Sequence, residues 1–375
     1  MIYTIKKIIL TTLGVFFSSI IFAQNNSIID SLSFYGKLSV HGAFFDDEVQ
    51  LQQNSPRVGI YLERKIINNL SVIGNLEYGI NMIDGNQFNN DANNIVDFSN
   101  DPFVENKAFV NRITYVGFQH PKWGTLSVGK QWGVYYDVAA FTDNFTVFGG
   151  ESTGVYSANT DGGWKGTGRA ENAIIYRNSL NNFDFGLQSQ LFKGSQNYGF
   201  SLIYNLNIGL SLGVAGNIAQ INSEFEEFIS YERKHNNNML FSAKYAKKNK
   251  FNVALSYAIN QDEFTTIDTV SDDIEIIAYP THGIELYANY FIKPKLELQA
   301  GFNRIHDIEK DSYFRGDYVL MHYVIGANYY ITPKTYAYAS ARIGDSKFVN
   351  NTRDYDLFVL GFAYNFNFNK SNKSN

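Results

Sequence analysis

The sequence predicts an all-β protein, a transmembrane antiparallel β-barrel of about sixteen strands. Three observations predict this fold. The composition favours strands, apolar and polar side chains alternate with a period of two, and the links between strands are alternately short and long. One alternation runs from Phe34 to Phe368 without a linker, so we expect a single barrel domain.

The N-terminal residues predict an export signal. Lys6 and Lys7 precede an apolar run over 8–22, and Ala23 provides a small residue at a cleavage point. Basic, apolar and small residues in this order are typical of a secretory signal peptide, and the run is short for a membrane anchor. We expect a signal peptide over 1–23, the barrel over 24–368 and a polar tail over 369–375.

The composition points to strands and excludes several function classes. The chain holds 31 Phe, 26 Tyr and 3 Trp but only 6 Pro, a balance that suits strands. A formal net charge of −5 argues against nucleic-acid binding, and the absence of cysteine excludes disulfides. Mean hydropathy is only −0.22, as expected for a barrel in which alternate residues face lipid.

The alternation is clearest in the second half of the chain. Over 251–260 the odd positions are mostly large and apolar, and the even positions are small or polar. Side chains alternate across a strand, so each such segment has one apolar face. A soluble sandwich would bury that face, whereas a barrel would turn it to lipid. In the last strand, one face is formed by Phe358, Leu360, Phe362, Tyr364, Phe366 and Phe368.

The lengths of the links decide between these alternatives. Outer-membrane barrels join their strands by tight periplasmic turns and long outer loops, and a sandwich has no reason to keep that order. The predicted short links are 68–69, 120–122, 179–182, 247–250, 293–295 and 332–334. The predicted long links are 45–55, 82–108, 132–168, 219–236, 261–282, 306–317 and 345–355.

Other constellations carry little chemistry. The six histidines are scattered and there is no cysteine, so we expect no metal site and no cofactor. An acidic cluster over 306–311 could hold a divalent cation, but a solvated outer loop is the simpler interpretation. The glycine-rich 162–168 lacks the strand and helix of a phosphate cradle. No convergent catalytic set is visible, so we expect no enzyme.

The segment after residue 108 resembles a known family. Residues 127–137 run into Phe-Thr-Asp at 141–143 and Phe-Gly-Gly at 148–150, and Gly-Arg at 168–169 is followed by Tyr-Arg-Asn-Ser at 176–179. In order and spacing these resemble the general diffusion porins of Gram-negative outer membranes. The resemblance implies a homotrimer of sixteen-stranded barrels, each with a third loop folded inward to narrow the pore.

The resemblance also implies a constriction between wall and loop. Lys37, Arg57, Arg112 and Arg169 match the basic cluster that the family has on the barrel wall, and Asp143 matches an acid of the loop. Many relatives have an acid immediately before Phe-Gly-Gly, where this chain has Val147, so the cation selectivity common in the family is not implied. The matched constriction loop continues through Phe148, Gly149, Gly150 and Glu151.

The alternation supports two of these wall residues independently. Lys37 shares a face with Ser39 and His41, opposite Leu38 and Val40. A cation facing lipid at mid-depth costs about 2–4 kcal/mol, so this lysine should face the lumen. The same argument turns the arginine at position 57 inward, away from the apolar face of its own strand.

Three functions follow as hypotheses. The first is an outer-membrane pore through which small hydrophilic solutes and ions diffuse passively, in contact with outer-membrane lipid and no nucleic acid. The second is a substrate- or anion-selective channel on the same barrel. The third is a plugged barrel that acts as an adhesin or an enzyme.

Overall fold

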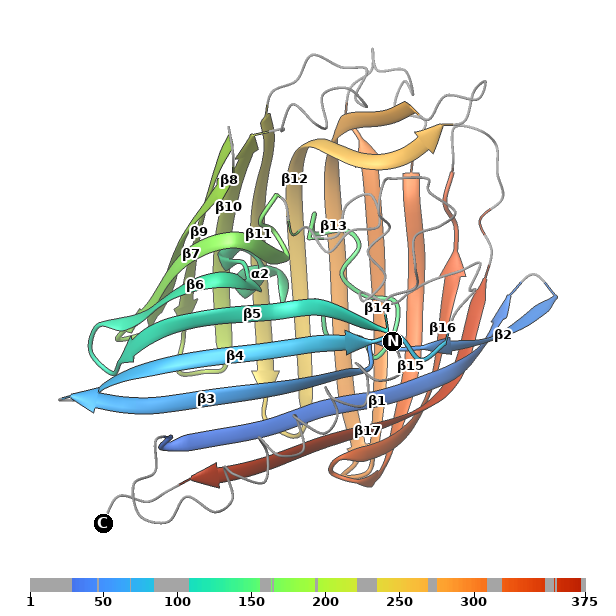
Figure 1. Ribbon diagram of the computed structural model, residues 1–375. Coiled ribbons are helices and arrows are strands. Elements are labelled where there is room, and N and C mark those ends of the chain that lie inside the picture. Colours follow the sequence, from blue (N-terminus) through green and yellow to red (C-terminus); the bar gives the residue numbers. More distant parts are fainter. Residues whose placement is uncertain are drawn as a thin grey trace, which may run out of the picture.

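The sheet closes on itself where the first strand meets the last. A computed structural model describes residues 29–45, 47–67, 69–83, 108–155, 163, 165–192, 195–220, 235–268, 275–308, 319–347, 354 and 356–371, without the side chains of 235, 261–268, 275–279, 307 and 371. Strand β1 (Ser31–Phe45) pairs antiparallel with β17 (Leu357–Ser371), from Ser31 opposite Ser371 to Phe44 opposite Phe358. Strands that follow one another along the chain pair antiparallel around the rest of the wall (Figure 1).

Most strands are nine to fifteen residues long, enough to cross a bilayer when tilted. The remaining strands are β2 (Glu48–Gln53), β3 (Arg57–Ile67), β4 (Leu70–Ile80), β5 (Phe109–His120), β6 (Gly124–Trp132), β7 (Arg169–Leu180), β8 (Phe183–Phe192), β9 (Ser195–Asn205), β10 (Leu210–Gln220), β11 (His235–Lys247), β12 (Phe251–Asp268), β13 (Glu275–Lys293), β14 (Leu296–Asp307), β15 (Val319–Thr332) and β16 (Thr335–Gly344).

The short strand β2 and the longer strand β3 share one position in the wall. Both β2 and β3 pair with β1, β2 with its C-terminal part and β3 with its N-terminal part. The break between them falls at Asn54, Ser55 and Pro56, where Ser55 has φ of 49° and Pro56 has no N–H to donate. Counted over the described residues, the wall is therefore the predicted antiparallel barrel of sixteen strands.

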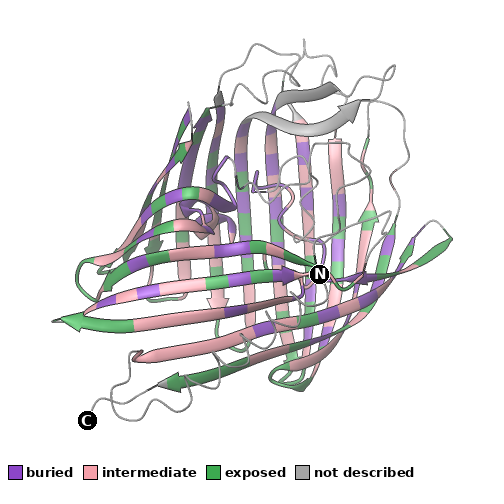
Figure 2. Cartoon of the chain, viewed as in Figure 1, coloured by how far each residue is buried: buried purple, intermediate pink, exposed green. Residues whose placement is uncertain are grey.

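The outer surface is apolar, as the alternation predicted. Along β8 and β9, Leu187, Phe200 and Leu202 are exposed, whereas Gln188 and Ser201 on the opposite face are buried. Figure 2 shows this alternation as bands of buried and exposed residues along most strands. A continuous exposed apolar surface of this kind requires lipid around it.

Three predicted boundaries differ from the structure. The link predicted over 261–282 is too long, because β12 and β13 keep pairing across two bulges up to Asp268 opposite Glu275. The link predicted over 45–55 contains β2. Strand β17 continues to Ser371, into the predicted tail, because β1 supplies a partner that far. The predicted signal peptide over 1–23 lies outside the described residues.

The apolar packing inside the barrel lies between the wall and one inserted segment. This segment, residues 133–168 between β6 and β7, is called the inserted loop below. Its described part contains α2 (Val134–Ala139), which lies inside the barrel (Figure 1). Among the described residues, no helix has the length and apolar character needed to cross a membrane.

Candidate functional site

The inserted loop begins with a helix that lies on a smooth part of the wall. Val134 and Val138 of α2 face Gly186, Gly199 and Gly213 on β8, β9 and β10. A Cβ at Gly186 would lie 2.7 Å from Val134 Cγ1, and one at Gly213 would lie 2.9 Å from Val138 Cγ1. Glycine therefore allows the helix to approach the strands closely.

An ion pair fixes the helix to the neighbouring wall. Arg177 of β7 donates from Nε and Nη2 to the two carboxylate oxygens of Asp137, at 2.8 and 3.0 Å. Nη2 also donates to the carbonyl of Trp132, where the inserted loop leaves β6. Ser201 of β9 donates to Asp137 at 3.3 Å. Two-pronged arginine–carboxylate contacts fix orientation as well as distance, so the start of the loop is held rigidly.

Beyond the helix, the loop follows the wall through hydrogen bonds to polar side chains. Thr142 contacts Ser256 of β12 at 3.0 Å between hydroxyl oxygens. Thr146 donates its N–H and its hydroxyl to Gln299 of β14, both at 3.1 Å. Its carbonyl accepts from Asn54, in the break between β2 and β3, at 2.9 Å. The loop backbone thus finds partners on strands far from it in sequence.

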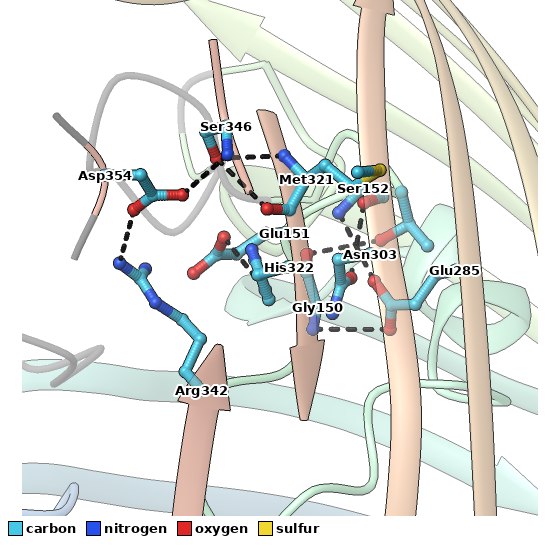
Figure 3. Close-up of polar contacts among 11 residues, drawn as sticks. Gly150, Glu151, Ser152, Glu285, Asn303, Met321, His322, Arg342, Ser346 and Asp354 are labelled. Carbon is cyan, nitrogen blue, oxygen red and sulfur yellow. Dashed lines mark hydrogen bonds and ion pairs between the residues drawn. The ribbon is translucent and has the colours of Figure 1, made fainter. Parts of the chain in front are cut away.

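A buried glutamate holds the next turn of the loop. Gly150 N–H and Ser152 N–H donate to the two carboxylate oxygens of Glu285 on β13, each at 3.3 Å (Figure 3). The Ser152 hydroxyl donates to Asn303 of β14 at 3.2 Å. The Ser152 carbonyl lies so near Gly283 that a Cβ there would be 1.7 Å away. Gly283 therefore lets this turn approach the wall, and Glu285 beside it holds the turn by hydrogen bonds.

Val147 and Phe148 turn toward the wall. They are 3% and 1% exposed, and they pack in one apolar cluster with residues of β1, β15, β16 and β17, among them Val324, Tyr338 and Val359. Phe148 has φ of 68°. A carboxylate at position 147 would be buried among apolar side chains, so packing accounts for the valine that stands where many relatives have an acid.

The remaining residues of the predicted constriction loop also hold the loop against the wall. Gly150 has φ of 81°, which an L residue rarely adopts, and a Cβ at Gly149 would lie 2.9 Å from the ring of Phe145. Glu151 lies 3.5 Å from His322 of β15, measured between Oε2 and Nε2 (Figure 3). This carboxylate is therefore directed at the wall.

On the facing wall, three of the predicted cations come together. Lys37 of β1 is directly opposite Arg57 of β3 in the strand register. Arg112 Nε donates to Glu77 of β4 at 2.9 Å, and Arg57 Nε lies 3.9 Å from the same carboxylate. Arg57 keeps 33% of its side chain exposed and Arg112 only 4%. We call Lys37, Arg57, Arg112 and Glu77 the basic wall.

A β-bulge brings Arg112 to the inner face. Glu77 pairs with Ile113 and Tyr78 with Asn111, which leaves Arg112 as the extra residue of β5. A bulge redirects side chains and breaks the strict alternation of a strand. Arg112 and Ile113 are therefore both buried, although they are consecutive.

The remaining two predicted residues lie at the inserted loop itself. Arg169, the first residue of β7, is buried, with its guanidinium carbon 6.0 Å from the centre of the Trp132 ring. Asp143 follows α2 and accepts a hydrogen bond from the Tyr136 hydroxyl at 2.7 Å. Asp143 is partly exposed, and the neighbouring Asn144 is exposed.

Sequence reasoning missed several residues that hold this site together. Glu77 binds the predicted cation Arg112. Arg177 binds Asp137 of α2, and Glu285 binds the loop turn at Gly150. Lys244 of β11 was also missed, and its Nζ lies 4.3 Å from the centre of the Phe141 ring. The alternation of apolar and polar positions was the available signal, since each of these residues lies on the polar face of its strand. The partners could not be found, because they are distant in sequence.

Among the described residues, no group of three metal-binding side chains gathers. A closed barrel with an apolar exterior and a loop seated inside it defines the class of outer-membrane β-barrel proteins. The sequence profile described as Gram-negative porin matches residues 10–370. The chain belongs to this family, and it is a passive channel of the outer membrane.

Known proteins support this at two levels. Outer membrane porin F of Xenorhabdus nematophila is 26% identical over 370 residues, covering 90% of this chain and 92% of that protein. Among solved structures, OmpF of Salmonella typhi in complex with daunomycin has a TM-score of 0.72 at 18% identity, covering 91% of this chain and 99% of that one. OmpT of Vibrio cholerae in its trimer form has a TM-score of 0.63 at 15% identity, covering 89% and 99%.

Proposed function

We propose that the inserted loop and the basic wall form the constriction of a general diffusion channel for small hydrophilic solutes and ions. One observation carries the proposal. The loop is held on the wall from β8 to β17 and β1 by glycine contacts, hydrogen bonds and apolar packing, while Asp143 and Asn144 keep exposed surface. We expect a loop held in this way to narrow the lumen and to leave a path for solutes beside Asp143 and Asn144.

The charges of the constriction have separate roles. Lys37 and Arg57 supply positive potential to the lumen from β1 and β3, and Asp143 supplies negative potential from the loop. Arg112 chiefly holds Glu77 in place, and Arg169 adds positive charge at the base of the loop. Opposed charges across a narrow aqueous pore create a transverse field that favours polar solutes over apolar ones.

Recording in planar bilayers tests this function directly. We expect large current steps that rise linearly with voltage and select weakly between ions. We also expect uptake of small sugars into liposomes at rates that fall with solute size. A purified, folded barrel that gives no conductance would refute the proposal and favour a plugged barrel that serves as an adhesin or an enzyme.

A weak preference for anions is the second candidate. It is favoured because Val147 packs against the wall, which leaves Asp143 as the acid of the matched loop segment that can face the lumen. The basic wall holds three cations against one carboxylate. The reversal potential in a gradient of potassium chloride would decide, since a clear preference for potassium contradicts this candidate.

We propose that the chain assembles as a homotrimer in outer-membrane lipid. Membership of the porin family and the similarity to the trimeric form of OmpT support this assembly. Electrophoresis in SDS before and after boiling, with a mass measurement in detergent, tests it. A species of monomer mass in mild detergent would contradict it.

A further inference from the structure

A tyrosine ring lies flat against the lumen wall next to the basic wall. Tyr35 of β1 is directly opposite Gly59 of β3, and a Cβ at Gly59 would lie 2.4 Å from Tyr35 Cζ. The Tyr35 hydroxyl donates to Asn75 of β4 at 3.0 Å. One face of the ring is therefore pressed on backbone, the hydroxyl is held, and the other face is directed at the lumen.

Two further tyrosines flank this ring. Tyr61 of β3 pairs with Asn75, which pairs in turn with Tyr115 of β5. Adjacent strands are about 4.8 Å apart, so Tyr61 and Tyr115 stand roughly 10 Å apart with an amide between them. We call Tyr35, Tyr61 and Tyr115 the tyrosine shelf.

The shelf has charged neighbours whose positions are fixed. Glu77 pairs with Gly59, directly beside Tyr35, and holds Arg112 at 2.9 Å. Arg57 lies two residues from Gly59 on the same strand and keeps a third of its side chain exposed. All three shelf residues are partly exposed. The shelf lies between Arg57 and the short turn after β3, which is the periplasmic end of a porin barrel.

We propose that the tyrosine shelf is a saturable binding site for neutral saccharides that leave the constriction. This inference rests on the proposed channel function and names a solute class for it. A sugar ring has a flat face of C–H groups that stacks on an aromatic ring, and its rim of hydroxyls needs donors and acceptors. The shelf supplies rings, and Asn75 and Arg57, which are both partly exposed, supply donors and an acceptor.

The same residues explain why a sugar fits better than other solutes. The tyrosine hydroxyls and the Asn75 amide interrupt the apolar surface. An aromatic hydrocarbon bound there would leave these polar groups without hydrogen-bond partners, which costs free energy. Because the Tyr35 hydroxyl is already oriented by Asn75, little ordering of this ring is needed when a sugar binds.

Titration of single channels with maltotriose tests the site. We expect brief blockages whose frequency saturates with concentration, and polyethylene glycol of equal mass should give none. Tyr35→Ala should raise the half-blocking concentration about tenfold, which corresponds to one stacked ring. Tyr35→Phe keeps the ring and should have a smaller effect. Tyr204→Ala, on the outer face of β9, is the matched control.

Each outcome bears on one claim. Normal current steps with no saturation by maltotriose, or with equal block by the glycol, would overturn the saccharide site and leave the channel intact. Absence of current steps would refute the channel itself. Should Tyr35→Ala fail to fold, judged by heat-dependent migration in SDS gels, Tyr61→Ala is the second variant. An unchanged half-blocking concentration in Tyr61→Ala would also overturn the proposal.

Discussion

Two parts of the inner wall differ in what they contact: one lies against the inserted loop, and the other faces water and solutes. The wall under the inserted loop presents glycines and neutral amides, such as Gly213, Gly283 and Gln299, together with one buried carboxylate, Glu285. The basic wall presents Lys37 and Arg57 beside tyrosines and keeps them partly exposed. The first surface is adapted to a polypeptide backbone, which needs close approach and hydrogen-bond partners. The second is adapted to water and solutes.

This contrast explains why the loop lies where it does. A backbone segment inside a barrel must satisfy its N–H and C=O groups, and charged long side chains offer few fixed partners for them. Glycine allows contact, and Gln, Asn and Glu accept or donate at fixed positions. The loop therefore settles on the amide-rich wall and leaves Lys37 and Arg57 partly exposed.

The largest expected effect comes from placing a charge under the loop. Val147→Glu would bury a carboxylate in the apolar cluster of Tyr338, Val324 and Val359, and an unpaired buried charge costs about 3–5 kcal/mol. We expect the loop to detach at its tip, with noisier and larger currents and earlier unfolding in SDS on heating. Val147→Leu, which keeps the site apolar, is the control. A quiet channel with a shifted reversal potential would instead show that position 147 faces the lumen.

A smaller steric change should act on the next turn of the loop. In Gly283→Ala the added Cβ would meet the Ser152 carbonyl oxygen at 1.7 Å, and overpacking of this kind costs about 1–3 kcal/mol. We expect larger single-channel conductance and faster liposome swelling with larger sugars. Gly74→Ala is matched, because its nearest atom would be the Tyr115 carbonyl oxygen at 3.7 Å. Equal behaviour of both variants would contradict the close seating of the loop.

The sequence could predict the strands but only part of this contrast. Repeating alternation located the inserted loop between Trp132 and Arg169 as observed, because that signal is local. The break at Pro56 and the bulge at Arg112 interrupt the period, so counting alternate residues misplaces side chains near them. Contacts such as Glu285 with Gly150 join residues more than a hundred positions apart and leave no local pattern.

The candidate constriction was predictable to the same extent. The family resemblance located Lys37, Arg57 and Arg112, which the structure brings together. It could not show that Glu77 lies among them, or that the Val147 side chain points to the wall. Both depend on strand register and on packing between distant segments. These are tertiary properties that one sequence does not display.

Replacing the carboxyl group of the buried anchor by an amide should loosen the loop without releasing it. Glu285→Gln keeps the shape but replaces one acceptor oxygen by an amide that meets a backbone N–H. A hydrogen bond contributes about 0.5–1.5 kcal/mol, and the loss here is of that order. We expect more open-channel noise at unchanged mean conductance. Glu63→Gln makes the same replacement in β3, where Glu63 accepts from Ser71, and should leave the noise unchanged.

The smallest effects should be changes in ion preference, and they separate the two walls. Arg57→Ala removes a cation that is one-third exposed, so the reversal potential should shift toward cations. Asp143→Asn should shift it the opposite way by a similar amount. Arg169→Ala should shift it less, because Arg169 is buried beside Trp132 and its field reaches the lumen through the loop.

These shifts have to be measured at low salt, because ions screen exposed charges over about 10 Å at 0.1 M. At 1 M salt the reversal-potential shift of Arg57→Ala should disappear, whereas the noise caused by Glu285→Gln should remain. That result would show that the basic wall acts through its electric field and that the wall under the inserted loop acts through direct contact. An Arg169→Ala shift larger than that of Arg57→Ala would reverse this assignment. In that case Arg169 would be the dominant cation of the pore.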